Sequence, residues 1–428
     1  MMRYKAIKTR IRLDKDQTRF LLLLMRSSKN LYNQALYNVR QHFFETGEFL
    51  TYNENYHLLK TSENYRMLNS SLAQTVIRKV DEAMKAFFGS IKSTNTKKVR
   101  LPRYLDKLGY YSLIDRMVYK PQSGYYTLPR GNFIKRISKY YKLPKKQENL
   151  SNLLSLSEEL NIKIITPKCI INKQIKEITI KPKFDGKYIE VIHTYLEEDV
   201  LEENINLKTE TMGIDLGFNN LATCAVTNAK HLLIDGYKLK SLNQWYHKRM
   251  SHLNSTRPNQ NVLTKQMMSL IIKRNNQMTY GINKAARLIM KHAITNNTGE
   301  IIIGYNKDFK DTILSDRYNQ MAKSIPLAKL RDRIIYLATE YGIESKVINE
   351  SYTSIASYLD NDVVPELDYK KHTFSGRRTK RGLYVSKEGK IINADLNAAL
   401  NILKKGNPNT ARLGYSGVNT PKRTYLFG

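Results

Sequence analysis

The chain has 428 residues, with 71 Lys or Arg against 38 Asp or Glu, so its formal net charge is +33. Hydrophobic residues make up 41% of it, which supports a sizeable core and argues against wholesale disorder. Solubility requires only a few net charges. The excess therefore predicts a polyanionic partner, and nucleic acid fits best because each neutralised phosphate releases counterions.

The 29 tyrosines strengthen this interpretation, because aromatic side chains among basic residues stack well on unpaired bases. An AT-rich genome, whose codons favour Lys, Asn, Ile and Tyr, explains part of the tyrosine excess. It does not explain the scarcity of acidic residues, so nucleic acid stays the expected partner.

Two cysteines, Cys169 and Cys224, are too few for a zinc cluster or a disulfide framework. The longest purely apolar run, 20–25, is far shorter than the ~20 residues of a membrane span, and 1–13 has no signal-peptide core. We therefore expect a cytoplasmic protein, in the bacterial cytosol or nucleoid, with no membrane partner.

The first hundred residues predict a strand and a small helical module. Residues 2–13 alternate as a strand does, and Asp16 is expected to cap the helix that follows. The apolar stripe of that helix consists of Phe20, Leu24, Leu31, Ala35 and Val39. A second helix is expected over about 71–91, with Val76, Val80, Ala83 and Phe87 facing inward.

The pattern changes to β-structure between residues 110 and 195. The pair Asp185-Gly186 stands between the runs 175–183 and 188–195, which is a good hairpin signal. Residues 142–158, rich in Lys, Asn and Ser, are expected to form an inserted loop or a short helix.

After residue 207 the order of elements predicts one mixed sheet. A hairpin over 211–227 with Gly217 near its turn and a third strand over 231–234 come first. Basic helices over about 240–295 and a buried strand over 300–305 follow. The remaining elements are a helix from near Ser324 to Tyr341 with Pro326 in its first turn, a strand over 343–350 and a helix over 395–403. The order βββ-α-β-α-β-α is that of an RNase H-like fold.

Two aspartates are candidate metal ligands. Hydrolysis of a phosphodiester by two metal ions needs carboxylates that converge on one point, and Mg²⁺ prefers oxygen ligands. Asp215 lies in an apolar strand, where a lone carboxylate is costly unless it is paired or metal-bound; the alternative is an exposed strand end. Asp395 opens a helix, so a capping role is the strong alternative for it.

In RNase H-like nucleases a third acid usually ends the fourth strand, which here is 300–305, but Gly304 stands at that place. Glu300 faces the same way yet lies ~13 Å back along the strand at ~3.3 Å per residue, and Asp308 and Asp311 in the following loop are weaker candidates. Glu350 ends the neighbouring strand, about 4.8 Å away, and can reach sideways into the space that Gly304 leaves. The alternative is that Glu350 pairs with a basic neighbour.

At these residues the chain resembles the TnpB transposon-encoded nucleases, which are related to type V CRISPR effectors and to Fanzor proteins. The similar segments appear in the family's order over about 210–403, and they read GIDLGFNNLAT (213–223), IIIGYNK (301–307), ESYTS (350–354), FSGRR (374–378), and GLY (382–384) through NADLNAA (393–399). The N-terminal half is similar only in general layout.

The resemblance implies an α+β multidomain protein with a RuvC-type, RNase H-like nuclease domain. It implies a wedge-like β-barrel from 1–13 and 108–205, a helical recognition lobe over 14–107, the nuclease domain from 208–350 and 391–408, a target-binding insert over 351–390, and a flexible C-terminal tail over 409–428. The family usually carries a four-cysteine zinc finger between its last two acids. Because 351–394 contains no cysteine, the insert is expected to lack zinc.

By the resemblance, Asp215 and Asp395 correspond to the first and third RuvC carboxylates, and Glu350 to a rearranged second one. The implied cofactor is two Mg²⁺ ions, with Mn²⁺ as an alternative. The implied partners are a guide RNA and a double-stranded target DNA, with one chain as a monomer on one guide.

Basic residues are expected to contact the nucleic acids, although an ordinary solvated surface is the alternative for each group. A loop with Lys97, Lys98, Arg100 and Arg103 is expected to contact phosphates, and the helices to line a heteroduplex channel through Lys248, Arg249, Lys273, Arg274, Lys284 and Arg287. In the insert, Arg377, Arg378, Lys380 and Arg381 are expected to steer a displaced single strand.

The function implied is that of an RNA-guided DNA endonuclease that recognises a short target-adjacent motif. The alternative is a guided but nuclease-inactive DNA-binding protein, such as a repressor, because Gly304 replaces the usual glutamate. A transposing enzyme in the strict sense is disfavoured, since nothing resembles a tyrosine nucleophile with a paired-histidine metal site.

Overall fold

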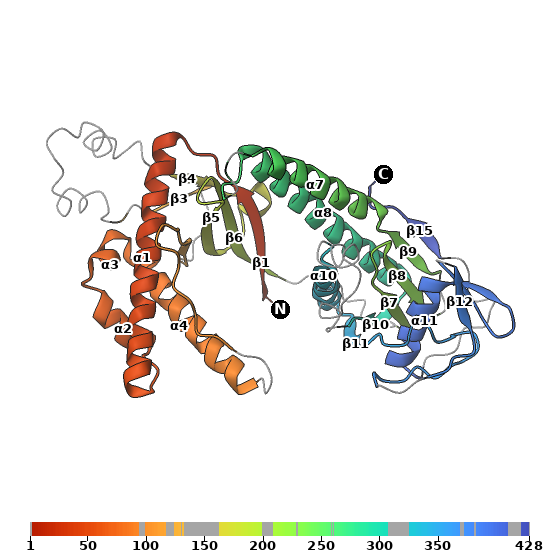
Figure 1. The fold of residues 1–428 in the computed structure, drawn as a ribbon. Coiled ribbons are helices and arrows are strands. Elements are labelled where there is room, and N and C mark those ends of the chain that lie inside the picture. Colours follow the sequence, from red (N-terminus) through yellow and green to blue (C-terminus); the bar gives the residue numbers. More distant parts are fainter. Residues whose placement is uncertain are drawn as a thin grey trace. The chain divides into compact units, whose positions relative to one another are not determined.

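The structure is a computed structural model that describes residues 2–93, 99–116, 124–129, 131, 162–198, 209–227, 230–257, 259, 261–306, 325–368, 372–380, 382–409 and 421–427. The chain divides into two compact units, Met1–Asp199 and Val200–Gly428, and each is described by itself (Figure 1). Among the described residues, no helix is both long and apolar enough to cross a bilayer.

The helices of the first unit pack around a long helix. They are α1 (Lys15–Thr46), α2 (Tyr52–Leu59), α3 (Glu63–Met67) and α4 (Ser70–Ser93). The prediction that Asp16 caps α1 is wrong. Asp14 has the extended backbone of an N-cap and accepts a hydrogen bond from the backbone N–H of Gln17 at 2.7 Å, which leaves Asp16 in the first turn.

The first unit also contains a four-stranded antiparallel sheet in the order β1-β6-β5-β2. Its strands are β1 (Met2–Arg10), β2 (Leu113–Asp115), β5 (Ile175–Lys183) and β6 (Tyr188–Glu198). β3 (Tyr125–Thr127) pairs separately with β4 (Lys163–Ile165), and a short 3₁₀ helix covers Lys168–Ile170. The expected hairpin of β5 and β6 is confirmed, with Phe184 and Asp185 in the left-handed region at its turn.

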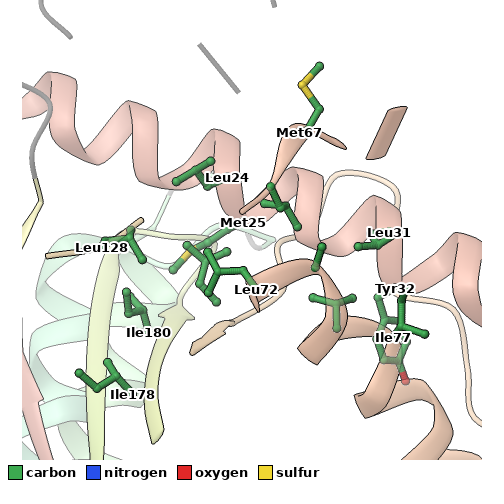
Figure 2. Close-up of a cluster of buried hydrophobic side chains, with 14 of the residues drawn as sticks. Leu24, Met25, Leu31, Tyr32, Met67, Leu72, Ile77, Leu128, Ile178 and Ile180 are labelled. Atoms are coloured by element: carbon green, nitrogen blue, oxygen red, sulfur yellow. The ribbon is translucent and has the colours of Figure 1, made fainter. Parts of the chain in front are cut away.

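One hydrophobic core joins these helices to the sheet. Figure 2 shows Leu24 and Leu31 of α1 and Leu72 and Ile77 of α4 in this cluster, with Ile178 and Ile180 of β5. The expected stripe of α1 is buried throughout, from Phe20 to Val39. Residues 142–158, for which a loop or short helix is expected, lie outside the described residues.

The second unit is built on a six-stranded mixed sheet in the order β11-β10-β7-β8-β9-β15 (Figure 1). The strands are β7 (Glu210–Asp215), β8 (Asn220–Val226), β9 (Leu232–Asp235), β10 (Thr298–Gly304), β11 (Glu344–Ile348) and β15 (Lys422–Thr424). β7, β8 and β9 are antiparallel in succession, whereas β10 is parallel to both β7 and β11. The predicted order of strands is therefore confirmed.

Helices cover both faces of this sheet. They are α7 (Tyr237–Thr256), α8 (Lys265–Thr295), α10 (Leu327–Glu340) and α11 (Ala394–Gly406). α8 and α10 share a core with Met212 and Ile214 of β7, while α11 packs on the opposite face against Ala225. α10 begins one residue after Pro326, so this proline caps the helix and does not lie in its first turn as expected.

Two short pieces of β-structure were not expected. β12 (Arg377–Lys380), β13 (Leu383–Val385) and β14 (Ile391–Asn393) form an antiparallel sheet within the insert. The prediction of a flexible tail over 409–428 is wrong for 421–427. β15 pairs in parallel with β9, and Leu426, two residues after β15, is buried in the core of the unit. Residues 422–426 are therefore fixed by strand pairing and by packing.

Candidate active site

The sheet of the second unit brings the ends of three parallel strands to one edge. Ile214 of β7 pairs with Ile303 of β10, so the next residues, Asp215 and Gly304, lie side by side where the two strands end. The carboxyl ends of parallel strands are where open α/β sheets usually carry their sites.

Glu350 occupies the space beside Gly304. A β-carbon on Gly304 would stand 3.3 Å from the Cβ of Glu350 and 2.4 Å from the Cδ1 of Ile402 on α11. The second distance is closer than real β-carbons come, so a side chain at position 304 would require Ile402 to shift. The structure therefore places Glu350 beside Gly304, and its role as the second carboxylate of the site stays a prediction.

The strand that leads to Glu350 is shorter than expected. β11 ends at Ile348, whose carbonyl accepts a hydrogen bond from the N–H of Tyr305 at 3.0 Å. Glu350 lies two residues later in a turn, where its carbonyl accepts hydrogen bonds from the N–H and hydroxyl of Thr353 at 3.2 and 2.8 Å. These bonds fix the backbone that carries the side chain.

Asp395 is brought to the same edge by the packing of α11 on β7. A β-carbon on Gly213 would lie 2.3 Å from the carbonyl oxygen of Ala399 and 2.7 Å from the Cβ of Leu403. Glycine is thus required at position 213 for this helix to approach the strand so closely. The side chain of Asn393 caps α11 by accepting from the N–H groups of Asp395 and Leu396, so Asp395 itself is not the cap.

Two side chains hold the carboxylate of Asp395. The amide nitrogen of Asn220, at the start of β8, donates to Oδ2 at 2.5 Å. The guanidinium of Arg378, on β12 of the insert, lies 3.5 Å from Oδ1. The side chain of Asp395 is 25% exposed, so it is reachable from solvent while both partners orient it.

The three acids share one electrostatic environment. Burial raises the pKa of Asp215 well above its usual range, and the negative charges of Glu350 and Asp395 raise it further, against the opposing charge of Arg378. Burial also raises the pKa of Glu350, although a hydrogen bond from the backbone N–H of Asn306 opposes this. Like charges that are partly desolvated together are costly unless a cation joins them.

The donor set suits a hard divalent cation, because all three side chains offer carboxylate oxygens. As the side chains stand, however, the described part of the chain contains no group of three or more His, Cys, Asp or Glu residues spaced to hold a metal ion. The charges of Glu350 and Asp395 act on Asp215, but the oxygens of the three side chains do not converge on one point at metal-binding distances. Their fit to a cation therefore rests on charge and chemistry.

Of the other acids considered for this site, Glu300 is the one that the structure describes, and it does not reach the site. Glu300, near the opposite end of β10, binds the ammonium of Lys346 at 2.6 Å and the amide of Asn407 at 2.9 Å. Asp308 and Asp311 lie outside the described residues.

The expected nucleic-acid contacts fall into three groups. Arg100 and Arg103 are exposed in the first unit, while Lys97, Lys98 and Arg381 lie outside the described residues. Arg377, Arg378 and Lys380 lie on the exposed strand β12, and the guanidinium of Arg378 lies 3.5 Å from the carboxylate of Asp395. Lys248, Arg249, Lys273, Arg274, Lys284 and Arg287 lie on α7 and α8.

The α7–α8 pair is basic throughout. No Asp or Glu occurs between Asp235 and Glu300, so nothing on these two helices offsets their cations. Arg274 is partly structural, because its Nε donates to Asn243 at 2.9 Å and its guanidinium lies over the ring of Tyr246. Lys248, Arg249, Lys273 and Arg287 are exposed.

Polar side chains hold the insert together. Both carboxylate oxygens of Asp362 are used: they accept from the N–H of Ser357 at 2.7 Å and from the N–H and hydroxyl of Ser375 at 3.0 and 2.6 Å. Asn397 and Asn401 of α11, both fully buried, donate to the carbonyl of Ala356. The loops of the insert are thus fastened to one another and to the helix that carries Asp395.

Sequence reasoning missed Asn220 and the amides of α11. Asn220 stands within the segment 213–223 that was used for the resemblance, but its role depends on a partner 175 positions away. Asn397 and Asn401 could have been identified from sequence. Two asparagines four residues apart lie on the same, buried side of an apolar helix and therefore need hydrogen-bond partners.

Fold and site together define an α+β multidomain protein whose second unit brings three acids to one edge of its sheet and carries a strongly basic helix pair. The family model described as probable transposase, OrfB_IS605, matches residues 193–310, and the Cas12f1-like TNB domain matches 328–402. A TnpB-like protein, ORF457, of Acidianus two-tailed virus is 25% identical over 426 residues, which cover 91% of this chain and 84% of that protein. The resemblance to the TnpB family is therefore confirmed.

Solved structures give weaker likenesses. A Cas12f1-sgRNA-target DNA complex is 16% identical with a TM-score of 0.34, over 94% of this chain and 99% of the other. The mini-RNA-guided endonuclease CRISPR-Cas_phi3 is 10% identical with a TM-score of 0.46, over 96% and 93%. Scores this low assign no shared fold by themselves.

Proposed function

We propose that the chain is an RNA-guided DNA endonuclease whose second unit is a RuvC-type, RNase H-like nuclease domain. Three antiparallel strands followed by parallel β10 and β11, with α11 against β7, support this assignment. The two family matches lie over the same strands and over α11.

The observation that carries the proposal is the meeting of Asp215, Glu350 and Asp395 at one edge of the sheet. They come from a strand end, a turn and a helix start, yet the charges of Glu350 and Asp395 both act on Asp215. Three like charges close together lower the stability of a fold, so a purely structural role does not explain why these residues meet.

In this proposal the three carboxylates would hold Mg²⁺, or alternatively Mn²⁺, and two such ions would stabilise the attacking and leaving oxygens of a phosphodiester. The chain's own residues prepare the site. Asn220 orients Asp395, and the N–H of Asn306 holds Glu350. Arg378 keeps one positive charge beside the acids, where a phosphate would approach.

The basic surfaces would hold the nucleic acids. Base pairing with a guide RNA would read the target, while the exposed cations of α7 and α8 would grip the backbone of the heteroduplex. We assign the first unit, as a wedge-like barrel with a helical recognition lobe, to contacts with a short motif beside the target, where the major groove distinguishes all base pairs.

The test is a cleavage assay with the RNA that copurifies with the protein. Sequencing that RNA defines the guide, from which a matching double-stranded target is made. We expect cutting that requires Mg²⁺ and the matching target, and we expect Asp215→Asn to bind the target with unchanged affinity but not to cut it. Cutting by this variant at the wild-type rate would refute the site.

The alternative is a guided DNA-binding protein without nuclease activity. It is favoured by one observation: the described acids are not spaced to hold a metal ion as they stand. A wild-type complex that binds its matched target in Mg²⁺ and Mn²⁺ but never nicks it would support this alternative against the proposed endonuclease.

A further inference from the structure

An exposed group of one arginine and two tyrosines lies on the strand β15, directly after it, and at the start of α7. The Cζ of Arg423 lies 5.9 Å from the ring centre of Tyr237 and 5.8 Å from that of Tyr425. Tyr237 is 48% exposed and Tyr425 is 62% exposed. We call these three side chains the stacking platform.

Two hydrogen bonds to Asp235 fix the position of the stacking platform. One carboxylate oxygen of this buried residue accepts from Nη2 of Arg423 at 2.6 Å, and the other accepts from the N–H of Tyr237 at 2.9 Å. Leu426, which is buried, anchors the chain directly after Tyr425. The planar guanidinium is therefore fixed, and a fixed planar group stacks at a smaller entropic cost than a mobile one.

The surroundings of the platform favour a polyanion. Lys238 and Lys422 are exposed next to it in the sequence, and the ammonium of Lys240 lies 5.9 Å from the ring centre of Tyr237. No acidic residue occurs in 236–299 or after Asp395, and Asp235 is neutralised by Arg423. Exposed aromatic faces beside lysine side chains suit a single-stranded nucleic acid, whose unpaired bases can stack on them.

The platform lies on the same row of the sheet as the proposed nuclease site. Successive partners across β7, β8, β9 and β15 are Asp215, Thr223, Leu233 and Arg423. Directly paired residues point to the same face of a sheet, so Arg423 shares a face with Asp215. Three strand spacings of about 4.8 Å separate the two residues by roughly 14 Å. A stacked strand covers that distance in about four nucleotides at its 3.4 Å rise.

We propose that the stacking platform binds unpaired bases of the DNA strand that is led to Asp215, Glu350 and Asp395. This inference rests on the proposed nuclease function only for the identity of the strand. It assigns Tyr237, Arg423 and Tyr425 as positioning residues that hold the strand a few nucleotides away from the acids.

The test measures binding without a guide and without cleavage. Fluorescence anisotropy follows a labelled oligothymidine and an abasic oligonucleotide of equal length, in EDTA and at a salt concentration that weakens non-specific contacts. We expect the variant Tyr237→Ala/Tyr425→Ala to raise the Kd for oligothymidine at least about tenfold. Each lost base–aromatic stack weakens binding by about 1–3 kcal/mol, and about 1.4 kcal/mol corresponds to a tenfold change in Kd. The Kd for the abasic probe should not change.

Three controls make the result specific. Tyr425→Ala alone removes a ring that is 62% exposed, so its effect does not depend on refolding of the site. Tyr237→Phe/Tyr425→Phe keeps the rings and should bind as the wild type does. Tyr341→Ala removes a tyrosine that is 40% exposed elsewhere in the same unit, and it should also bind normally.

Equal affinity of wild type and the double alanine variant would overturn the proposal, and so would an equal loss with the abasic probe. A loss seen only with oligouridine would give the platform to RNA and overturn the assignment to DNA. Because no step of this assay needs cutting, failure of guided cleavage in the wild type would refute the nuclease function and leave the binding result standing.

Discussion

The Cβ of Glu350 lies 3.3 Å from the point at which a β-carbon on Gly304 would stand. We propose that Glu350, from a different stretch of chain, supplies the acid next to Asp215 in place of a residue at position 304, and we call this the exchange with Gly304. A side chain at position 304 would require the Cδ1 of Ile402 on α11 to move, so glycine at this position leaves room for Glu350.

The first prediction follows from this exchange. Glu350→Gln keeps the shape of the side chain and its hydrogen-bonding reach but removes its charge. We expect guided cleavage to fall at least about 100-fold, because loss of a metal-binding carboxylate costs several kcal/mol of transition-state stabilisation. Single-turnover cleavage of a matched target measures this, and target binding should stay unchanged.

Glu300→Gln is the matched control, because Glu300 lies near the opposite end of β10 and binds Lys346 and Asn407. It should cut at the wild-type rate. If Glu300→Gln abolished cutting while Glu350→Gln did not, the second acid would be Glu300 and the exchange with Gly304 would be wrong.

Asn220 gives the second prediction, since it donates to Oδ2 of Asp395 at 2.5 Å. Asn220→Ala should raise the Mg²⁺ concentration needed for half-maximal cutting by about 10- to 100-fold, the usual effect of losing a partner behind a metal ligand. Asn393→Ala should instead lower the free energy of unfolding by about 1 kcal/mol through loss of a helix cap. A normal Mg²⁺ requirement in Asn220→Ala would show that this amide does not orient the acid.

The exchange at Gly304 could be predicted from sequence because it depends on local rules. The expected RNase H-like order put an acid at the end of β10, where Gly304 stands, and Glu350 follows the neighbouring strand β11 at the same end. Asp215 and Asp395 were predictable for a related reason, since each is a charged residue in an apolar element.

What could not be predicted depends on pairing between distant residues. β12 consists of four exposed polar residues, and β15 of three residues, two of them exposed, so neither shows an apolar alternation. Each is a strand only because another strand lies beside it. Asn220 is an ordinary strand residue until the fold brings Asp395 to it, and the spacing between the three carboxylates likewise depends on side-chain packing.

Gly213 tests how closely α11 must approach β7. A methyl group there would meet the carbonyl of Ala399 at 2.3 Å and Leu403 at 2.7 Å, so the helix has to move outward. We expect Gly213→Ala to destabilise the protein by about 1–3 kcal/mol and to slow cutting, because Asp395 moves with the helix. Urea unfolding and cleavage are measured together.

Gly89→Ala serves as its control, because a β-carbon at that position of α4 meets nothing within 4 Å. This change should raise the stability by up to about 1 kcal/mol through a better helix propensity. Equal stabilities of Gly213→Ala and the wild type would show that α11 does not depend on the missing side chain.

A further prediction concerns the hydrogen bonds of Asp362 that stabilise the insert. Asp362 accepts three hydrogen bonds from Ser357 and Ser375, and Asp362→Ala leaves those groups without this partner. We expect a loss of about 2 kcal/mol in the stability of the insert, measured by hydrogen exchange of the amides of β12–β14. Glu388→Ala, which removes only an exposed pair with Lys390, should change it by less than about 0.5 kcal/mol.

The last prediction concerns His193 of β6, whose side chain is fully buried and whose Nδ1 has no hydrogen-bond partner. Burial lowers the pKa of this histidine from 6.5 to about 4. Below pH 6.5 the unfolded chain therefore takes up a proton that the folded chain refuses until about pH 4. Stability should then decrease as the pH falls through this window, by at most about 3 kcal/mol.

Urea unfolding at pH 7.5 and pH 4.5 measures this contribution. His193→Leu should lose less stability than the wild type between the two pH values, because the group that titrates is gone. Thr9→Val removes only the hydroxyl that lies 3.4 Å from Nε2 of His193. It should shift the stability by the same amount at both pH values. An unchanged pH dependence in His193→Leu would mean that acid destabilises the protein through its carboxylates, and that this buried imidazole is protonated at no cost to the fold.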